Sequence, residues 1–151
     1  MPARKFFNTE EKEQIKAAIA RAERNTSGEI RLHLDNRCKI DVLDCAAWWF
    51  KKLKMHQTGL RNGVLFYLAV EDKKFAILGD AGINAKTPDD FWDHINETVL
   101  DHFKEGAFAE GLVKGIDMAG EALKEHFPYQ SDDINELSDE ISFGGGSDEK
   151  K

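Results

Sequence analysis

The side chains most able to do chemistry in this chain lie in three short segments, at residues 27–29, 61–63 and 79–84. Carboxylate and amide oxygens are hard ligands of the kind that Ca²⁺ and Mg²⁺ prefer in proteins. Glycines next to such ligands also let backbone carbonyls approach an ion. If the fold brings the three segments together, they form a candidate divalent-cation site. The predicted metal ligands are Asp80, Glu29 and Asn62, and the supporting residues are Arg61, Ser27 and Asn84.

Three stretches next to these segments have the pattern of β-strands. Residues 29–34 alternate polar and apolar side chains, which is typical of a strand with one face more buried than the other. Residues 64–70 form a near-continuous apolar run, as expected for a central strand covered on both faces. A tight turn leads into residues 74–79, which we predict to return as the second strand of a hairpin.

Helical periodicity surrounds these strands. Apolar residues recur at helical spacing over residues 9–24, and Asp41 can cap a second amphipathic helix. Thr87 and Pro88 have the residue types of an N-cap and a first helical position, so they predict the start of a third helix. Residues 107–126 carry one apolar face and form the fourth helix.

The resulting order of elements, α-β-α-β-β-α-α, determines how the strands pair. A strand, a crossover helix and a second strand imply a right-handed parallel pair, to which the hairpin adds an antiparallel strand. We therefore predict an α/β fold, a three-layer α/β/α sandwich with a small mixed central sheet and helices on both faces. In such a sheet the first two strands begin where the third one ends. The three polar segments should thus meet at one edge of the sheet.

A purely structural interpretation of this edge stays open. Arg61 can form an ion pair with Glu29 or Asp80, and the glycines then only close tight turns. Ligands of α/β proteins also bind more often at the carboxyl ends of parallel strands, whereas this edge holds their amino ends. The residues alone therefore leave the cation site and the ion pair as competing interpretations.

Length and charge limit the classes of function. The 151 residues suit one domain, and a formal net charge of −7, with 28 acidic and 21 basic residues, includes no basic stripe for nucleic acid. The longest apolar run, residues 63–70, has only the length of a strand, so neither a membrane span nor membrane binding is expected. The expected ligand is a divalent cation, and an unidentified protein partner is a further alternative.

We predict one domain over residues 1–128, followed by a polar, loosely attached tail over residues 129–151. The N-terminus lacks the pattern of a signal peptide, and the only two cysteines, Cys38 and Cys45, fit neither a zinc knuckle nor a disulfide framework. We therefore expect reduced thiols and a cytoplasmic location. In an alternative arrangement, the tail covers the domain through its apolar residues Ile134, Leu137, Ile141 and Phe143.

Four motifs follow one another along the chain: Ser27-Gly28-Glu29-Ile30, Arg61-Asn62-Gly63-Val64-Leu65, Gly79-Asp80-Ala81-Gly82-Ile83 and the segment from Phe103 to Gly111. In this order they resemble the motifs of the TPM domain family. The resemblance covers residues 6 to about 127 and looks like a short, soluble bacterial branch of that family. It implies an α/β/α sandwich; some members of the family bind calcium at the corresponding edge, and a plant member has been described as an acid phosphatase.

Arg61 departs from the family pattern, which commonly has an acidic residue at this position. A fixed cation there weakens a metal site or adapts it to an anion. Our first hypothesis is a non-enzymatic domain that binds Ca²⁺ or Mg²⁺ at the three segments. The second is a metal-assisted phosphatase at the same edge, although the chain contains no G-x-S-x-G or P-loop motif. The third is a protein-interaction module without metal, whose partner contacts Trp49 or the tail.

Overall fold

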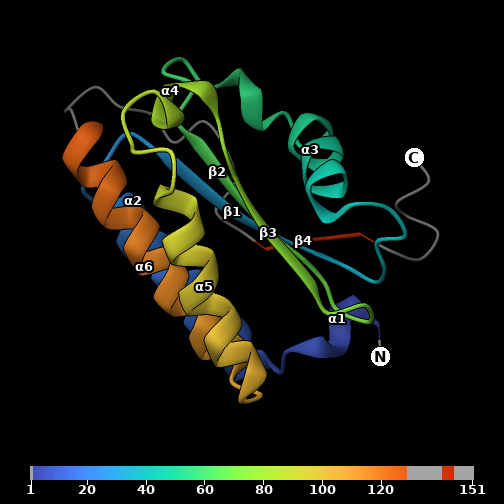
Figure 1. The fold of residues 1–151 in the computed structure, drawn as a ribbon. Helices are drawn as coiled ribbons and strands as arrows, with labels where there is room; N and C mark the ends of the chain where they lie inside the picture. Colours follow the sequence, from blue (N-terminus) through green and yellow to red (C-terminus); the bar gives the residue numbers. More distant parts are fainter. Residues whose placement is uncertain (1, 129–140, 145–151) are drawn as a thin grey trace.

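The computed structural model of the chain describes residues 2–128 and 141–144. Figure 1 shows layers of helices on the two sides of a twisted sheet. Among the helices of this described part, none combines the length and the apolar composition that a bilayer span requires. The elements in chain order are α1 (Ala3–Phe6), α2 (Thr9–Glu23), β1 (Glu29–Asp35), α3 (Val42–Lys52), the 3₁₀ helix η1 (Met55–Gln57), β2 (Gly63–Ala69), β3 (Lys74–Gly79), α4 (Ala81–Asn84), α5 (Phe91–Lys104), α6 (Phe108–His126) and β4 (Ser142–Phe143).

The strands form one mixed sheet in the order β3-β2-β1-β4. β1 pairs in parallel with β2, from Glu29 opposite Gly63 to Asp35 opposite Ala69. β2 and β3 form the antiparallel hairpin. Helices α2, α5 and α6 cover one face of the sheet, and α3 covers the other (Figure 1). The predicted three-layer α/β/α sandwich is confirmed.

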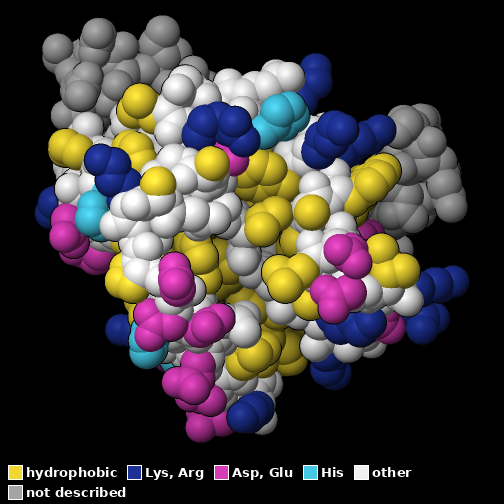
Figure 2. All heavy atoms as spheres, turned by 45° about the horizontal axis from the view of Figure 1, so that its top comes forward, with side chains coloured by type: hydrophobic (Ala, Val, Ile, Leu, Met, Phe, Trp, Pro, Cys, Tyr) yellow, Lys and Arg dark blue, Asp and Glu magenta, His cyan; other side chains and the backbone are white. Residues whose placement is uncertain are grey.

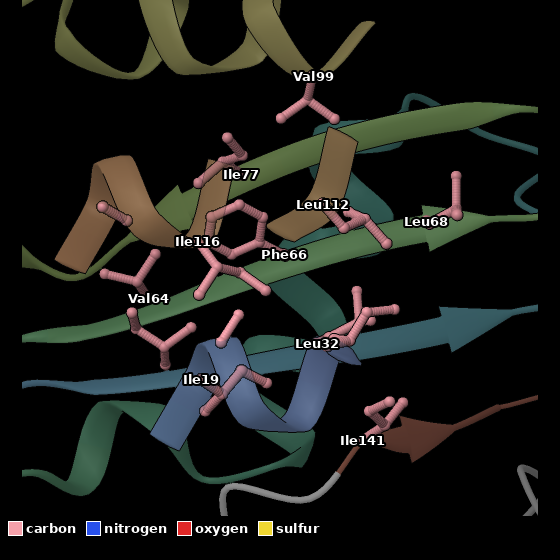
Figure 3. Packing of buried hydrophobic residues seen from close by; sticks show 14 of the residues in the cluster. Ile19, Leu32, Val64, Phe66, Leu68, Ile77, Val99, Leu112, Ile116 and Ile141 are labelled. Atoms are coloured by element: carbon pink, nitrogen blue, oxygen red, sulfur yellow. The ribbon is translucent and has the colours of Figure 1, made fainter. Parts of the chain in front are cut away.

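Alternation along β2 divides the core between the two faces. Val64, Phe66 and Leu68 belong to the larger cluster beneath α2, α5 and α6, as Figure 3 shows. Leu65 and Tyr67 belong to the smaller cluster beneath α3. Because both faces are covered, every residue of β2 is buried, which explains why its sequence is apolar throughout.

The helices begin where side chains satisfy their first backbone groups. The Asn8 side chain accepts a hydrogen bond from Glu11 N at 2.7 Å, and the Glu11 carboxylate accepts one from Asn8 N at 2.9 Å, which is a capping box for α2. The predicted start of the third helix is wrong, because α5 begins at Phe91 rather than after Thr87. The Thr87 hydroxyl instead donates to the Ile83 carbonyl at 3.1 Å, next to the end of α4.

A fourth strand, not predicted from the sequence, comes from the C-terminal segment. Ser142 and Phe143 pair in parallel with β1. Ile141 is buried in the larger core cluster, and Phe143 packs against that cluster. The alternative in which apolar residues attach the tail to the domain is confirmed for these two positions, whereas Ile134 and Leu137 lie outside the described residues.

Cys38 and Cys45 form a disulfide, with Cα atoms 6.4 Å apart. The expectation of reduced thiols is therefore wrong. The loop after β1 turns back into α3, whose N-cap is Asp41, and this reversal brings Cys38 next to the first turns of the helix. The spacing of the two cysteines in the sequence does not reveal the disulfide, because the distance between Cys38 and Cys45 depends on where α3 begins. The cytoplasmic location stays a prediction.

Reduction of this disulfide should lower the free energy of unfolding by about 2–3 kcal/mol, because a bridge that closes a short loop restricts the unfolded chain. Urea unfolding with and without dithiothreitol measures the difference. A double Cys38→Ser, Cys45→Ser variant serves as the control, since its stability should not respond to the reductant. Equal urea midpoints for the oxidised and reduced protein would contradict the expectation.

Candidate functional site

The three polar segments meet at one edge of the sheet, as predicted from the strand order. Glu29 N donates to the Asn62 carbonyl at 3.4 Å, and Asp80 N donates to the Gly63 carbonyl at 2.9 Å. Gly82 N donates to the Arg61 carbonyl at 2.7 Å, which ties α4 to the loop before β2. Backbone hydrogen bonds thus join the start of β1, the loop before β2 and the end of β3.

Arg61 and Asp80 form a bidentate ion pair at the centre of this edge. Arg61 Nε lies 2.7 Å from Asp80 Oδ2, and Arg61 Nη2 lies 2.8 Å from Asp80 Oδ1. Oδ1 also accepts a hydrogen bond from Ala81 N at 2.7 Å, which caps α4. The hydrogen bonds to Asp80 and then its negative charge raise the pKa of Arg61. The ion pair is the one that the structural interpretation anticipated.

The two partners differ in their access to solvent. The Asp80 side chain is only 6% exposed, whereas that of Arg61 is 52% exposed. Arg61 also has a φ of 53°, a left-handed conformation that is uncommon for residues other than glycine, asparagine and aspartate. A buried carboxylate is therefore neutralised by an exposed cation on a locally strained turn.

The two amide side chains of the predicted site hold the loops rather than facing a common centre. Asn62 Nδ2 donates to Ser27 Oγ at 3.3 Å. Asn84 Nδ2 donates to the Gly79 carbonyl at 2.9 Å, and Asn84 Oδ1 accepts from Trp92 Nε1 at 2.7 Å. The structure thus joins Ser27 with Asn62, and it joins Asn84 to the end of β3.

Glu29 does not join Asp80. Both residues flank Gly63, one through the β1–β2 pairing and one through the β2–β3 pairing, so their Cα atoms lie two strand spacings apart, or roughly 10 Å. Met55 lies above Gly63, since a Cβ there would be 3.0 Å from the Met55 carbonyl oxygen. Within residues 2–128 and 141–144, no three His, Cys, Asp or Glu side chains surround a common point. Asp80 provides a donor suited to a divalent cation, but the predicted ligand set is not preassembled.

A pocket of about 350 Å³ opens next to the ion pair. Figure 2 looks onto this region and shows Lys, Arg and His side chains close to a stretch of hydrophobic ones. The pocket therefore offers an apolar floor and a mainly cationic rim, with the Asp80 carboxylate at one side. It is lined by Phe50, Lys51, His56, Arg61, Leu78, Gly79 and Asp80.

Replacing Gly82 with alanine should lower the free energy of unfolding by about 1–3 kcal/mol, because the new methyl group overpacks the edge. Its Cβ would lie 2.1 Å from the Leu60 carbonyl oxygen and 2.6 Å from that of Arg61, and backbone atoms cannot move aside as a side chain does. The matched control is Gly59→Ala, where the added Cβ meets nothing within 4 Å. Thermal unfolding of the two variants measures the difference, and equal midpoints would contradict the expectation.

A second polar cluster, not predicted from the sequence, lies at the C-terminal end of β1. Asp35 Oδ2 accepts hydrogen bonds from Trp49 Nε1 at 3.1 Å and from the Tyr67 hydroxyl at 2.9 Å. A hydrogen bond of 2.8 Å joins His33 Nδ1 and Ser142 Oγ, and the His33 ring stacks on Trp49 with centroids 3.8 Å apart. No local motif could reveal this cluster, because Ser142 is 109 positions from His33.

His33 is the titratable group at the centre of this cluster. Burial, and then the positive charge of Arg31, lower its pKa to about 3. Gly144 packs directly against this cluster, since a Cβ there would lie 2.8 Å from both His33 Nε2 and Asp35 Oδ1. Within the described residues, Nε2 has no hydrogen-bond partner. A neutral imidazole of this kind, fully buried within the described residues, joins β4 to β1.

Comparison with known proteins agrees with the motifs at the edge. The sequence matches the TPM domain family over residues 3–122. The structure is similar to the NMR structure of the BA42 protein from the psychrophilic bacterium Bizionia argentinensis, with 52% identity, a TM-score of 0.86, and coverage of 93% of this chain and 97% of that chain. No curated protein matches the chain.

A more distant structure shows that the fold persists when the sequence diverges. The N-terminal domain of the cg2496 protein from Corynebacterium glutamicum is 17% identical, with a TM-score of 0.60, and the match covers 85% of this chain and 80% of that one. The family match includes all four motifs that suggested the resemblance. The chain therefore belongs to the TPM domain family.

Proposed function

We propose that this protein is a non-enzymatic binding domain in which a divalent cation, Ca²⁺ or Mg²⁺, competes with Arg61 for the carboxylate of Asp80. The observation that carries the proposal is the bidentate pair between a buried carboxylate and a half-exposed guanidinium. Of the predicted ligands, Asp80 is the primary one. Asn62 lies in the loop before β2 and Glu29 at the start of β1, and neither binds the ion directly in this proposal.

The physical reason for competition is that a buried carboxylate needs a compensating positive charge. Arg61 supplies this charge from a side chain that is 52% exposed, so it can return to water at little desolvation cost. A hydrated cation can take its place at Asp80 and neutralise the same charge. Occupancy of Asp80 then depends on which of the two cations is bound.

The neighbouring pocket supports the exchange by giving the ion room. Its volume of about 350 Å³ adjoins both Arg61 and Asp80, so a cation could keep several of its waters. Ions held by one carboxylate and water bind weakly, and we expect a Kd on the order of 10⁻⁴–10⁻³ M, as in the weakest calcium modules. Mg²⁺ suits such a hydrated site as well as Ca²⁺ does.

Titration of the amide NMR spectrum with CaCl₂ or MgCl₂ tests the proposal. We expect saturable shifts at residues 61–63 and 79–84, with smaller ones at 27–29. The Asp80→Asn variant keeps the size of the side chain and one acceptor oxygen but lacks the charge, and its shifts should be lost. Unmoved signals at 10 mM ion, or equal shifts in Asp80→Asn, would contradict the proposal.

Metal-assisted phosphoester hydrolysis is a second candidate, favoured by the cationic side chains of Lys51 and Arg61 and the imidazole of His56 around one pocket. Such groups can contact a phosphate, and a metal ion can activate water. Hydrolysis of p-nitrophenyl phosphate with Ca²⁺, Mg²⁺ or Mn²⁺ tests it. Activity that persists through purification and disappears in Asp80→Ala would support this candidate. A protein that binds Ca²⁺ or Mg²⁺ but does not hydrolyse the phosphoester supports the non-enzymatic binding domain.

A further inference from the structure

β3 is the edge strand of the sheet on the hairpin side. Asp80 N donates to Gly63, so the alternation of an antiparallel ladder turns the backbone groups of Phe75 and Ile77 away from β2. Within residues 2–128 and 141–144, no hydrogen bond from outside the ladder reaches these two backbone positions. Two N–H and two C=O groups thus point away from the ladder, on residues that are 6% and 7% exposed.

An apolar groove of about 200 Å³ runs along this edge, between α3 on one face and α5 on the other. Figure 2 shows hydrophobic side chains continuing down the middle of this face, between the two helices. Leu43 at the groove is 53% exposed and the nearby Ile40 is 59% exposed, which is unusual for large apolar residues. The groove is lined by Val42, Leu43, Phe75, Ala76, Ile77, Trp92, Asp93 and Asn96.

Acidic side chains border the groove on both sides. Asp93 of α5 lines it directly. Asp41 and Asp44 lie in the first turn of α3, next to the lining residues of that helix. Figure 2 shows acidic side chains on both sides of the hydrophobic stretch, most densely over α5. An occupant that carries lysine or arginine therefore fits the groove better than a neutral or acidic one.

The same charges disfavour a second copy of this chain as the occupant. Antiparallel pairing of two β3 strands requires a two-fold axis perpendicular to the sheet, which places both α5 helices on the same face of the joined sheet. The acidic residues of the two helices would then lie on either side of one junction. Like charges across an interface cost binding free energy.

We propose that the β3 edge is a binding site for an extended, basic peptide segment of a partner protein, which adds to the sheet as a fifth strand. The backbone of the peptide would bond to Phe75 and Ile77, its apolar side chains would enter the groove, and its lysines or arginines would face Asp93 and Asp41. Strand addition of this kind obtains affinity from main-chain hydrogen bonds and specificity from alternate side chains. This site is independent of the ion pair at Asp80.

The probe is the peptide acetyl-Lys-Lys-Val-Thr-Val-Lys-Lys-amide, added to the ¹⁵N-labelled full chain. We expect saturable shifts confined to β3, α3 and the start of α5, and at least tenfold slower hydrogen exchange at the Phe75 and Ile77 amides. Asp93→Lys should weaken binding at least fivefold. Glu121→Lys, the same charge change at an exposed position on α6, is the matched control and should bind as the wild type does.

Two control peptides separate strand addition from simple charge attraction. The variant with proline in place of the central threonine retains all four lysines but cannot form the same ladder, and the glutamate counterpart reverses the charge. Neither should protect Phe75 or Ile77. Equal binding of the proline peptide, shifts spread over all acidic surfaces, or a dimer that protects these amides without peptide would each overturn the proposal.

Discussion

Arg61→Asp should bind Ca²⁺ at least tenfold more tightly than the wild-type protein, a gain of about 1.4 kcal/mol or more in binding free energy. The substitution removes the cation that occupies both oxygens of Asp80 and adds a second carboxylate beside them. Calcium affinity rises with the number of charged ligands. Aspartate also tolerates the left-handed backbone conformation at this position, so the turn itself should persist. Isothermal titration calorimetry measures the affinity.

Stability gives an independent readout of the same variant. Without Ca²⁺, two neighbouring carboxylates repel each other, so Arg61→Asp should unfold at a lower temperature than the wild type does. Millimolar Ca²⁺ should restore the melting temperature, because a ligand that binds only the folded state stabilises it. Arg61→Lys keeps a positive charge and serves as the control, with little change in calcium affinity. An Arg61→Asp protein that binds no tighter than wild type would contradict competition at Asp80.

Acidification should destabilise the folded protein by about 2 kcal/mol between pH 7 and pH 5 through His33 alone. The pKa of His33 is about 3 in the folded protein and near its ordinary value of 6.5 in the unfolded chain. Between these two values the unfolded chain binds a proton that the folded protein does not. The stability is therefore fully present above pH 6.5, and it is lost progressively as the pH falls towards 3.

The window from pH 7 to pH 5 isolates this effect, because most carboxylates titrate below it. Urea unfolding at several pH values measures the slope, which His33→Gln should flatten. His94→Gln alters an exposed histidine on α5 and should retain the slope of the wild type. The expectation fails if the slope in this window is the same in His33→Gln as in the wild type.

The order of the seven long elements was predictable because each depends on local patterns. The buried run of β2, the turn into β3 and the periodic helices are all properties of neighbouring residues. The crossover rule then gave the parallel pairing of β1 and β2, and with it the meeting of the three loops. The start of α5 was not predictable in the same way, because the Thr87 hydroxyl donates to the Ile83 carbonyl instead of accepting from a backbone N–H of the next helix.

Two of the features that the sequence did not reveal, β4 and the His33 cluster, depend on contacts between distant segments. β4 is two residues long, and its place next to β1 depends on the packing of Ile141 and Phe143 with the larger core cluster. The His33 cluster includes Ser142, so it forms only when β4 pairs with β1. The disulfide depends on the path of the loop between β1 and α3. None of these leaves a periodic signal in the chain.

At the candidate site, the sequence identified the right loops but not the arrangement of the side chains within them. The strand order places Arg61 and Asp80 at one edge, yet only the structure shows that Arg61 pairs with Asp80 rather than with Glu29. The position of Met55 next to Gly63, the residue that Glu29 and Asp80 flank, was equally hidden. Strand topology predicts which loops meet, whereas the packing of single side chains decides which groups are available to a ligand.

The side-chain Nε–H NMR signal of Arg61, followed during a Ca²⁺ titration, tests competition for Asp80 most directly. If the ion replaces the guanidinium, this signal should shift and lose its protection from solvent exchange in step with the amide signals of residues 79–84. If the Arg61 signal keeps its position and protection while Ca²⁺ rises to 10 mM, the ion pair is permanent and the domain does not bind the cation at Asp80.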